Sequence, residues 1–133
     1  MSEFFERNRQ EYIDRLFRVS ALGEWEDWVT FHLHVTIAQS EASIERCASL
    51  QALRNTYRKR MAHASARIGG IVDRLFSLPV VRIVDVRNQF KVSYATAKAD
   101  VDRLVDAGIL VEIEGVYPKT FGAVEVMQTA YGD

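Results

Sequence analysis

The stretch from Val81 to Gly115 constrains the fold of this chain most, because its apolar residues and its helix-ending residues fall in a fixed order. A short apolar helix is predicted first, followed by a tight connection: Ile83, Val84 and Val86, then Phe90, Lys91 and Val92. Ser93 stands where a helix N-cap is expected, since its hydroxyl can accept a free backbone N–H. A second helix is predicted from apolar residues spaced i, i+4, i+7 and i+8, namely Ala97, Val101, Leu104 and Val105. Gly108 ends it, because glycine readily takes the left-handed conformation that follows a helix.

Two strands are predicted after this pair of helices. Apolar residues alternate with other residues from Ile109 to Ile113, and Gly115 permits a turn. Residues 116–121 can return as the partner strand, in which Pro118 indicates the edge of a sheet. The order helix, turn, helix and hairpin is that of a winged helix-turn-helix. We therefore expect a mainly α fold with a small β-hairpin wing: a helical extension over residues 1–68 and a winged helix-turn-helix domain over residues 69–133.

The helical extension is predicted to contain one long helix. Between Glu24 and about Met61 there is no proline or glycine, and two apolar stripes with offset faces run along the segment. The first stripe consists of Trp25, Trp28, Phe31, Val35, Ala38 and Ala42. About 38 residues would span roughly 57 Å, which is too long for a small domain to cover alone. We expect a partner domain or a homodimer; the alternative is that the helix folds back as a hairpin near Ser49, which would give a compact monomer.

Gly69-Gly70 predicts the joint between the two domains, since each glycine costs a helix interior about 1 kcal/mol relative to alanine. Before it, a first helix is predicted from residue 2 to about Ser20, ending at Gly23. After it, residues 71–78 supply the first helix of the winged domain, which Pro79 stops.

The net charge of −1 is unevenly distributed. Residues 1–50 carry five arginines against nine acids, whereas residues 51–69 carry five basic residues and no acid. This basic cluster consists of Arg54, Arg58, Lys59, Arg60 and Arg67. Because DNA binding needs cations facing phosphates, Arg58 and Arg60 are candidate phosphate contacts. The alternative is an ordinary solvated helix face.

No sequence feature predicts catalysis, a metal or a cofactor. His32 and His34 would lie about 200° apart on a helix, so they cannot share one ion. No nucleophile elbow and no phosphate-binding loop occurs. The single cysteine, Cys47, excludes an internal disulfide. No apolar run approaches the roughly 18 residues of a membrane span, and the N-terminus lacks the apolar centre of a signal peptide, so we expect a cytoplasmic chain with no membrane partner.

The N-terminal half resembles a known family. Its runs FFERNRQEYIDRL at residues 4–16, GEWEDWVTF at residues 23–31 and LRNTY at residues 53–57 are similar to the segment that follows the catalytic core in Fic (Fic/DOC-type) proteins. The resemblance continues from these runs into the predicted winged helix, so it covers nearly the whole chain. It implies a helical region followed by a winged helix. Proteins of that family commonly transfer AMP from ATP to a target hydroxyl with a His-Pro-Phe…Gly-Asn-Gly-Arg loop. That loop is absent here, so the resemblance implies no catalytic residue. It implies a fragment or a stand-alone accessory chain, with a Fic catalytic domain as a candidate partner.

The predicted recognition helix is similar to that of lac repressor-type helix-turn-helix proteins. VSYATAK at residues 92–98 resembles their Val-Ser-Tyr-Gln-Thr-Val-Ser-Arg, in which the exposed Tyr, Gln and Arg contact DNA. Tyr94 matches, but Ala95 and Ala99 cannot make the bidentate hydrogen bonds that discriminate bases by about 1–3 kcal/mol. Residues 93–107 also have a net charge of −1, because they contain Asp100, Asp102 and Asp106.

Two functions therefore stay open. The first is DNA binding, in a transcription-regulatory role with weak sequence specificity. Its predicted contacts are Ser93, Tyr94, Thr96 and Lys98 at the start of the recognition helix, Lys119 in the wing, and Arg58 and Arg60 in the basic cluster. The second is a protein-interaction or dimerisation module that regulates or positions a Fic adenylyltransferase domain. The local charge favours the second, and the frequency of DNA binding among winged helices favours the first, which is our leading hypothesis.

Overall fold

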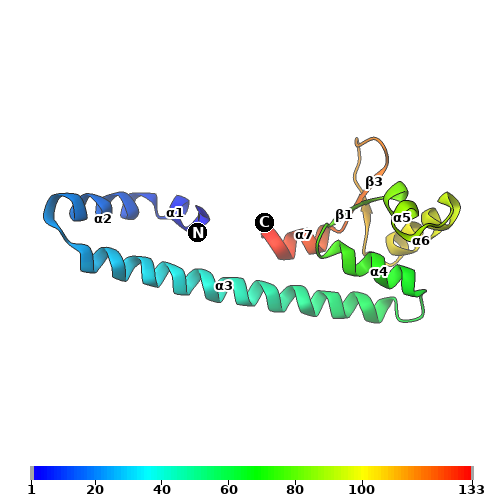
Figure 1. The fold of residues 1–133 in the computed structure, drawn as a ribbon, viewed down its shortest axis with the longest axis horizontal. Helices are drawn as coiled ribbons and strands as arrows, with labels where there is room; N and C mark the ends of the chain where they lie inside the picture. Colours follow the sequence, from blue (N-terminus) through cyan, green and yellow to red (C-terminus); the bar gives the residue numbers. More distant parts are fainter. Residues whose placement is uncertain (1, 133) are drawn as a thin grey trace. The chain divides into compact units, whose positions relative to one another are not determined.

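The computed structural model describes residues 2–132. Within that range the chain is mainly helical, with seven helices and a three-stranded antiparallel sheet (Figure 1). The helices are α1 (Ser2–Arg7), α2 (Arg9–Leu22), α3 (Trp25–Arg60), α4 (Ala66–Leu75), α5 (Ile83–Phe90), α6 (Tyr94–Asp106) and α7 (Val124–Tyr131). The strands are β1 (Val80–Arg82), β2 (Val111–Glu112) and β3 (Thr120–Gly122).

By their internal contacts the described residues form two units, unit 1 ending at Glu45 and unit 2 beginning at Arg46. The division falls inside α3, well before the predicted boundary between residues 68 and 69. α3 itself is one unbroken helix of 36 residues. The predicted long helix is thus confirmed, and the alternative hairpin near Ser49 is wrong.

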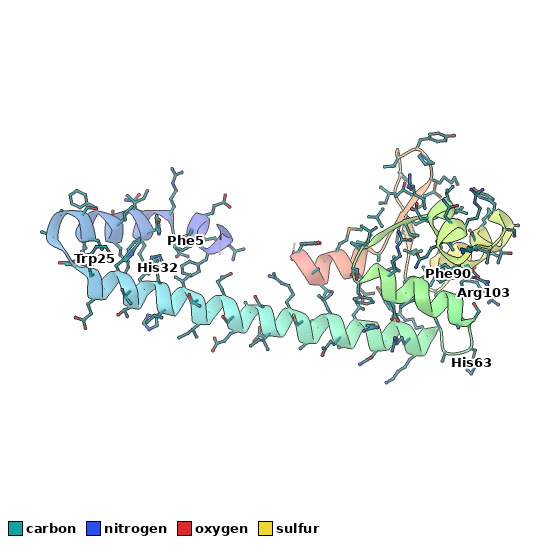
Figure 2. All side chains as sticks on the ribbon, viewed as in Figure 1. Phe5, Trp25, His32, His63, Phe90 and Arg103 are labelled. Carbon is teal, nitrogen blue, oxygen red and sulfur yellow. The ribbon has the colours of Figure 1, made fainter. Side chains whose placement is uncertain are left out.

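Unit 1 is a helical hairpin in which α1 and α2 pack against the first part of α3 (Figure 1). The predicted single first helix is wrong, because it is interrupted at Asn8, whose side-chain amide donates a 3.0 Å hydrogen bond to the Phe4 carbonyl. Gly23, at φ 69°, ends α2 as predicted. Figure 2 shows Phe5 and His32 between the helices. The imidazole of His32 has four aromatic rings with centroids 4.3 to 6.4 Å from its own: Phe5, Tyr12, Trp28 and Phe31.

Unit 2 is built around one apolar core to which α3, α4, α5, α6 and the sheet contribute. The predicted break at Gly69-Gly70 is wrong: α4 runs through both glycines and buries Ile68, Ile71, Val72 and Leu75 on one face. At Gly70 an added Cβ would lie 3.1 Å from two ring carbons of Phe90 in α5. The glycine therefore allows two helices to approach closely within the core.

The connection between α5 and α6 forms as predicted. Lys91 takes the left-handed conformation at φ 53°, and the N–H of Val92 donates to the Arg87 carbonyl over 3.2 Å. Ser93 then caps α6, its hydroxyl accepting the Thr96 N–H over 3.1 Å. Past the other end of α6, Gly108 is left-handed at φ 74°.

The sheet has the order β1-β3-β2, so β3 is its central strand. The predicted edge position of the second hairpin strand is therefore wrong: Phe121 pairs with Val81 on one side and with Glu112 on the other. Pro118 lies before β3, where no ladder N–H is required. Neither β1 nor α7 was predicted. α7 is joined to α3 by the hydroxyl of Tyr57, which donates a 2.8 Å hydrogen bond to Glu125.

Candidate functional site

The first turns of α6 bring four predicted DNA contacts together. Ser93 caps the helix through the Thr96 N–H, and the hydroxyls of Ser93 and Thr96 are hydrogen-bonded to each other at 2.9 Å. Tyr94 and Lys98 are exposed and one turn apart, while Ala97 beside them is buried in the core of unit 2. Tyr94 and Lys98 are therefore exposed at this end of α6, together with the capping residue Ser93, whereas Thr96 is half-buried.

The lysines of this candidate surface are paired with carboxylates. Lys98 Nζ lies 2.6 Å from Oδ2 of Asp102, one turn further along α6. That hydrogen bond raises the pKa of Lys98. In the connection between β2 and β3, Lys119 Nζ lies 3.3 Å from Oε1 of Glu112. A phosphate group must compete with these carboxylates for both ammonium groups.

Asp100 contributes little to the negative charge on the surface of α6, although its charge is part of the helix total of −1. Its side chain is turned into unit 2, leaving the residue 4% exposed, and accepts hydrogen bonds from Nε and Nη2 of Arg67 in α4. The exposed charges of α6 are thus balanced: Lys98 and Arg103 against Asp102 and Asp106. The spacing of Asp100 from Ala97 and Leu104 was the available signal, since residues three and four apart share a helix face.

Arg58 of the basic cluster is engaged within unit 2. Asp73 of α4 receives Arg54 Nε at 2.9 Å and Arg58 Nη2 at 2.7 Å. These hydrogen bonds, from Arg54 and then Arg58, lower the pKa of Asp73 to about 2. The structure therefore places Arg58 in a contact between α3 and α4.

Arg60 lies near the far end of α6. Its Nη1 is 3.4 Å from the Ala107 carbonyl, and its guanidinium is 5.7 Å from the ring centroid of Tyr57. Ala107 follows the last turn of α6, about 20 Å along the helix axis from Tyr94. The structure therefore does not bring Arg58 and Arg60 together with Tyr94 and Lys98.

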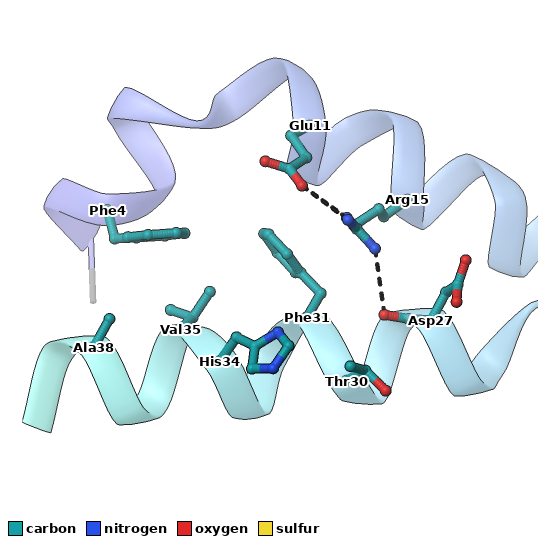
Figure 3. Close-up of a pocket in the computed structure, with 9 residues that line it drawn as sticks. All are labelled: Phe4, Glu11, Arg15, Asp27, Thr30, Phe31, His34, Val35 and Ala38. Atoms are coloured by element: carbon teal, nitrogen blue, oxygen red, sulfur yellow. Dashed lines mark hydrogen bonds and ion pairs between the residues drawn. The ribbon is translucent and has the colours of Figure 1, made fainter.

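A cleft of about 540 Å³ opens in unit 1 beside α3 (Figure 3). It is lined by Phe4, Glu11, Arg15, Asp27, Thr30, Phe31, His34, Val35 and Ala38. Figure 3 shows the guanidinium of Arg15 bonded to Glu11, at 2.9 Å, and to the Asp27 carbonyl, at 3.5 Å. It also lies 4.8 Å from the ring centroid of Phe31. The guanidinium at this cleft is thus held by groups of its own unit.

The structure also describes the contacts of His32, the possible metal ligands and the apolar character of the helices. His32 Nδ1 lies 3.0 Å from the Trp28 carbonyl. Among residues 2–132, no three His, Cys, Asp or Glu side chains gather where they could hold a metal ion. Over the same range, no helix combines the length and apolar character needed to cross a membrane.

Comparison with known proteins adds no relative. No protein-family model matches the chain, and no curated protein matches it. The resemblance to Fic proteins therefore rests on the residue runs themselves.

Proposed function

We propose that residues 66–122 form a winged helix-turn-helix with α6 as its recognition helix and the connection between β2 and β3 as its wing. The order α4, β1, α5, α6, β2, β3 supports this assignment. The short connection through Lys91, which lets α5 and α6 pack on each other, supports it further.

The proposed function of this domain is weak binding of duplex DNA through the start of α6. One observation carries it: the first turn of α6 has no acidic residue and exposes Tyr94, Ala95 and, one turn on, Lys98, while Asp100 is buried. A helix N-terminus adds a positive potential that attracts phosphate. The alanine can contact a thymine methyl but cannot read a base edge by bidentate hydrogen bonds, so sequence specificity is small.

The paired lysines set the affinity. Lys98 and Lys119 are each paired with a different carboxylate. We therefore expect dissociation constants of about 10⁻⁴ to 10⁻⁶ M for duplex DNA at physiological salt, the range of nonspecific association.

The test is a titration of labelled duplex at two salt concentrations. Lys98→Glu should weaken binding to every sequence and lower the salt slope by about one. Asp102→Asn should strengthen binding, because it frees the ammonium of Lys98 and removes a negative charge. Tyr94→Ala should reduce any preference among sequences. Arg9→Glu, an equal change of charge at an exposed residue of unit 1, is the matched control.

Three outcomes contradict DNA binding at this surface. The first is a Lys98→Glu variant that binds no more weakly than Arg9→Glu. The second is the absence of binding even at low ionic strength, and the third is binding that does not respond to salt.

A protein-interaction module is the second candidate, favoured by the ion pairs themselves. Because the charges of Lys98 and Lys119 are balanced by paired carboxylates, the surface resembles an ordinary polar protein contact more than a basic groove. Its expected partner is a Fic catalytic domain, which this module would position or regulate. Absence of DNA binding together with binding to such a domain would support this role.

We also propose that this chain is a non-catalytic, accessory part of a Fic-type protein. The residues that carry the resemblance have structural roles: Phe5, Tyr12 and Trp28 lie in the aromatic cluster of unit 1, and Tyr57 is fully buried in unit 2. The supporting observation to seek is a Fic core encoded directly upstream.

A further inference from the structure

The outer face of α3 in unit 1 carries a row of exposed apolar side chains. Trp25, Val29, Leu33 and Ile37 follow one another at intervals of four residues, and each is between 51% and 62% exposed. Ile44 extends the row and is 68% exposed. Trp25, predicted in one apolar stripe with Trp28 three residues further on, is 62% exposed at the start of α3. We call these five residues the α3 outer row.

The outer row is not needed for packing within unit 1. The side of α3 that faces α1 and α2 is filled by Trp28, Phe31 and His32 with the rings of Phe5 and Tyr12. Single exposed apolar residues are ordinary, whereas residues four apart on a helix are neighbours and form a continuous surface. From the exposed fractions, the row presents on the order of 500 Å² of apolar surface, which is in the range of the largest, often functional, patches on monomers.

Unpaired carboxylates lie along the same surface. Glu26 is three residues before Val29, and Glu41 lies between Ile37 and Ile44, at four and three residues from them. Glu41 and Glu45 are themselves one turn apart, a like-charge spacing that destabilises a helix unless a cation is near. Within residues 2–132 none of these three glutamates forms an ion pair.

The negative charge of unit 1 indicates which kind of partner can cover the outer row. Residues 1–45 contain nine acids and four arginines, so two copies meeting at the outer row would bring like charges together. A partner with arginine or lysine beside an apolar ridge would instead pair with the glutamates while covering the row.

We propose that the α3 outer row is a docking surface for another protein, which contributes an apolar helix flanked by basic side chains. The surface belongs to unit 1 and does not depend on the DNA-binding proposal for unit 2. The apolar contact supplies the affinity, and the glutamates at its edge select a basic partner.

The test uses the full chain and two labelled helical peptides that share one leucine face. One peptide carries lysines on its other positions and the second carries glutamates. By fluorescence anisotropy, the Leu/Lys peptide should bind, and the Leu/Glu peptide should bind at least about tenfold more weakly. Glu41→Gln with Glu45→Gln should weaken the Leu/Lys peptide alone.

A matched pair of variants separates apolar docking from simple charge attraction. Leu33→Asp should weaken the Leu/Lys peptide about tenfold, although it adds negative charge. Ala42→Asp adds the same charge to α3 at an exposed position that is not three, four or seven residues from any member of the row, and binding should stay equal or become tighter. Circular dichroism establishes that both variants are folded.

Three results would overturn the proposal. The first is equal binding of the Leu/Lys peptide by Leu33→Asp and Ala42→Asp. The second is no binding of either peptide. The third is a dimer in sedimentation equilibrium that Leu33→Asp dissociates and Ala42→Asp does not, because a second copy would then be the occupant.

Discussion

Replacement of Tyr57 should show that the last turns of α3 are a structural part of unit 2. Tyr57 is fully buried, its ring centroid lies 5.9 Å from that of Phe76, and its hydroxyl bonds to Glu125 over 2.8 Å. Burying an aromatic ring removes about 150–250 Å² from water, which at about 25 cal/mol per Å² is roughly 4–6 kcal/mol. Tyr57→Ala should therefore lower the free energy of unfolding by about 3–5 kcal/mol, as large-to-small core substitutions do.

Tyr57→Phe separates the hydroxyl from the ring. It keeps the packing with Phe76 and loses one hydrogen bond to an exposed carboxylate, so it should cost about 1 kcal/mol. Glu125→Gln should cost no more than Tyr57→Phe. Tyr131→Phe, at an exposed tyrosine of α7, should leave the free energy of unfolding unchanged.

The measurement is urea unfolding followed by far-ultraviolet circular dichroism on all four variants. If Tyr57→Phe is as destabilising as Tyr57→Ala, the hydroxyl and not the ring holds α3 in the core. If Tyr57→Ala costs less than about 1 kcal/mol, the ring does not have the core role assigned to it.

Three further predictions concern acid stability, the buried ion pair and catalysis. The arginines lower the pKa of Asp73 from 3.8 to about 2, so its contribution to stability is present above pH 3.8 and is lost as the pH falls toward 2; Arg54→Gln with Arg58→Gln should flatten this part of an acid titration of the unfolding midpoint. Arg67→Leu should destabilise the chain more than Asp100→Asn in urea unfolding, because it leaves a buried carboxylate without its partner, whereas Arg67 is partly exposed to water. The purified chain should not transfer labelled AMP to any protein; transfer that a point mutation in this chain abolishes would contradict the proposed non-catalytic role.

The features predicted correctly from sequence are those fixed by neighbours in the chain. The cap at Ser93 requires its hydroxyl and an N–H three residues later, and Gly108 requires only its own backbone freedom. Gly70 is the opposite case. Its role depends on the ring of Phe90 in another helix, so the sequence shows a helix-breaking residue where the fold has a close contact.

In the candidate site, too, local contacts could be predicted from sequence and contacts between distant residues could not. The exposure of Tyr94 and Lys98 follows from the helical period, and the pairing of Lys98 with Asp102 is a local spacing of four residues. The partner of Asp100 is Arg67, 33 residues away, and that of Arg58 is Asp73 in another helix. A charge total along the sequence treats these residues as free, whereas the fold buries Asp100 and pairs the exposed Arg58 with Asp73.

The long helix α3 was predicted to need a partner, but other parts of the same chain cover much of it. In unit 2 the last turns of α3 are covered by the chain's own core, where Tyr57 is buried and Leu50, Leu53 and Met61 pack against it. In unit 1 one side of α3 is covered by α1 and α2. The helix length alone therefore does not require a homodimer, and the remaining need is confined to the outer row from Trp25 to Ile44. Because unpaired glutamates lie beside that row, its apolar surface favours association while its charge opposes a second copy, and a basic partner satisfies both.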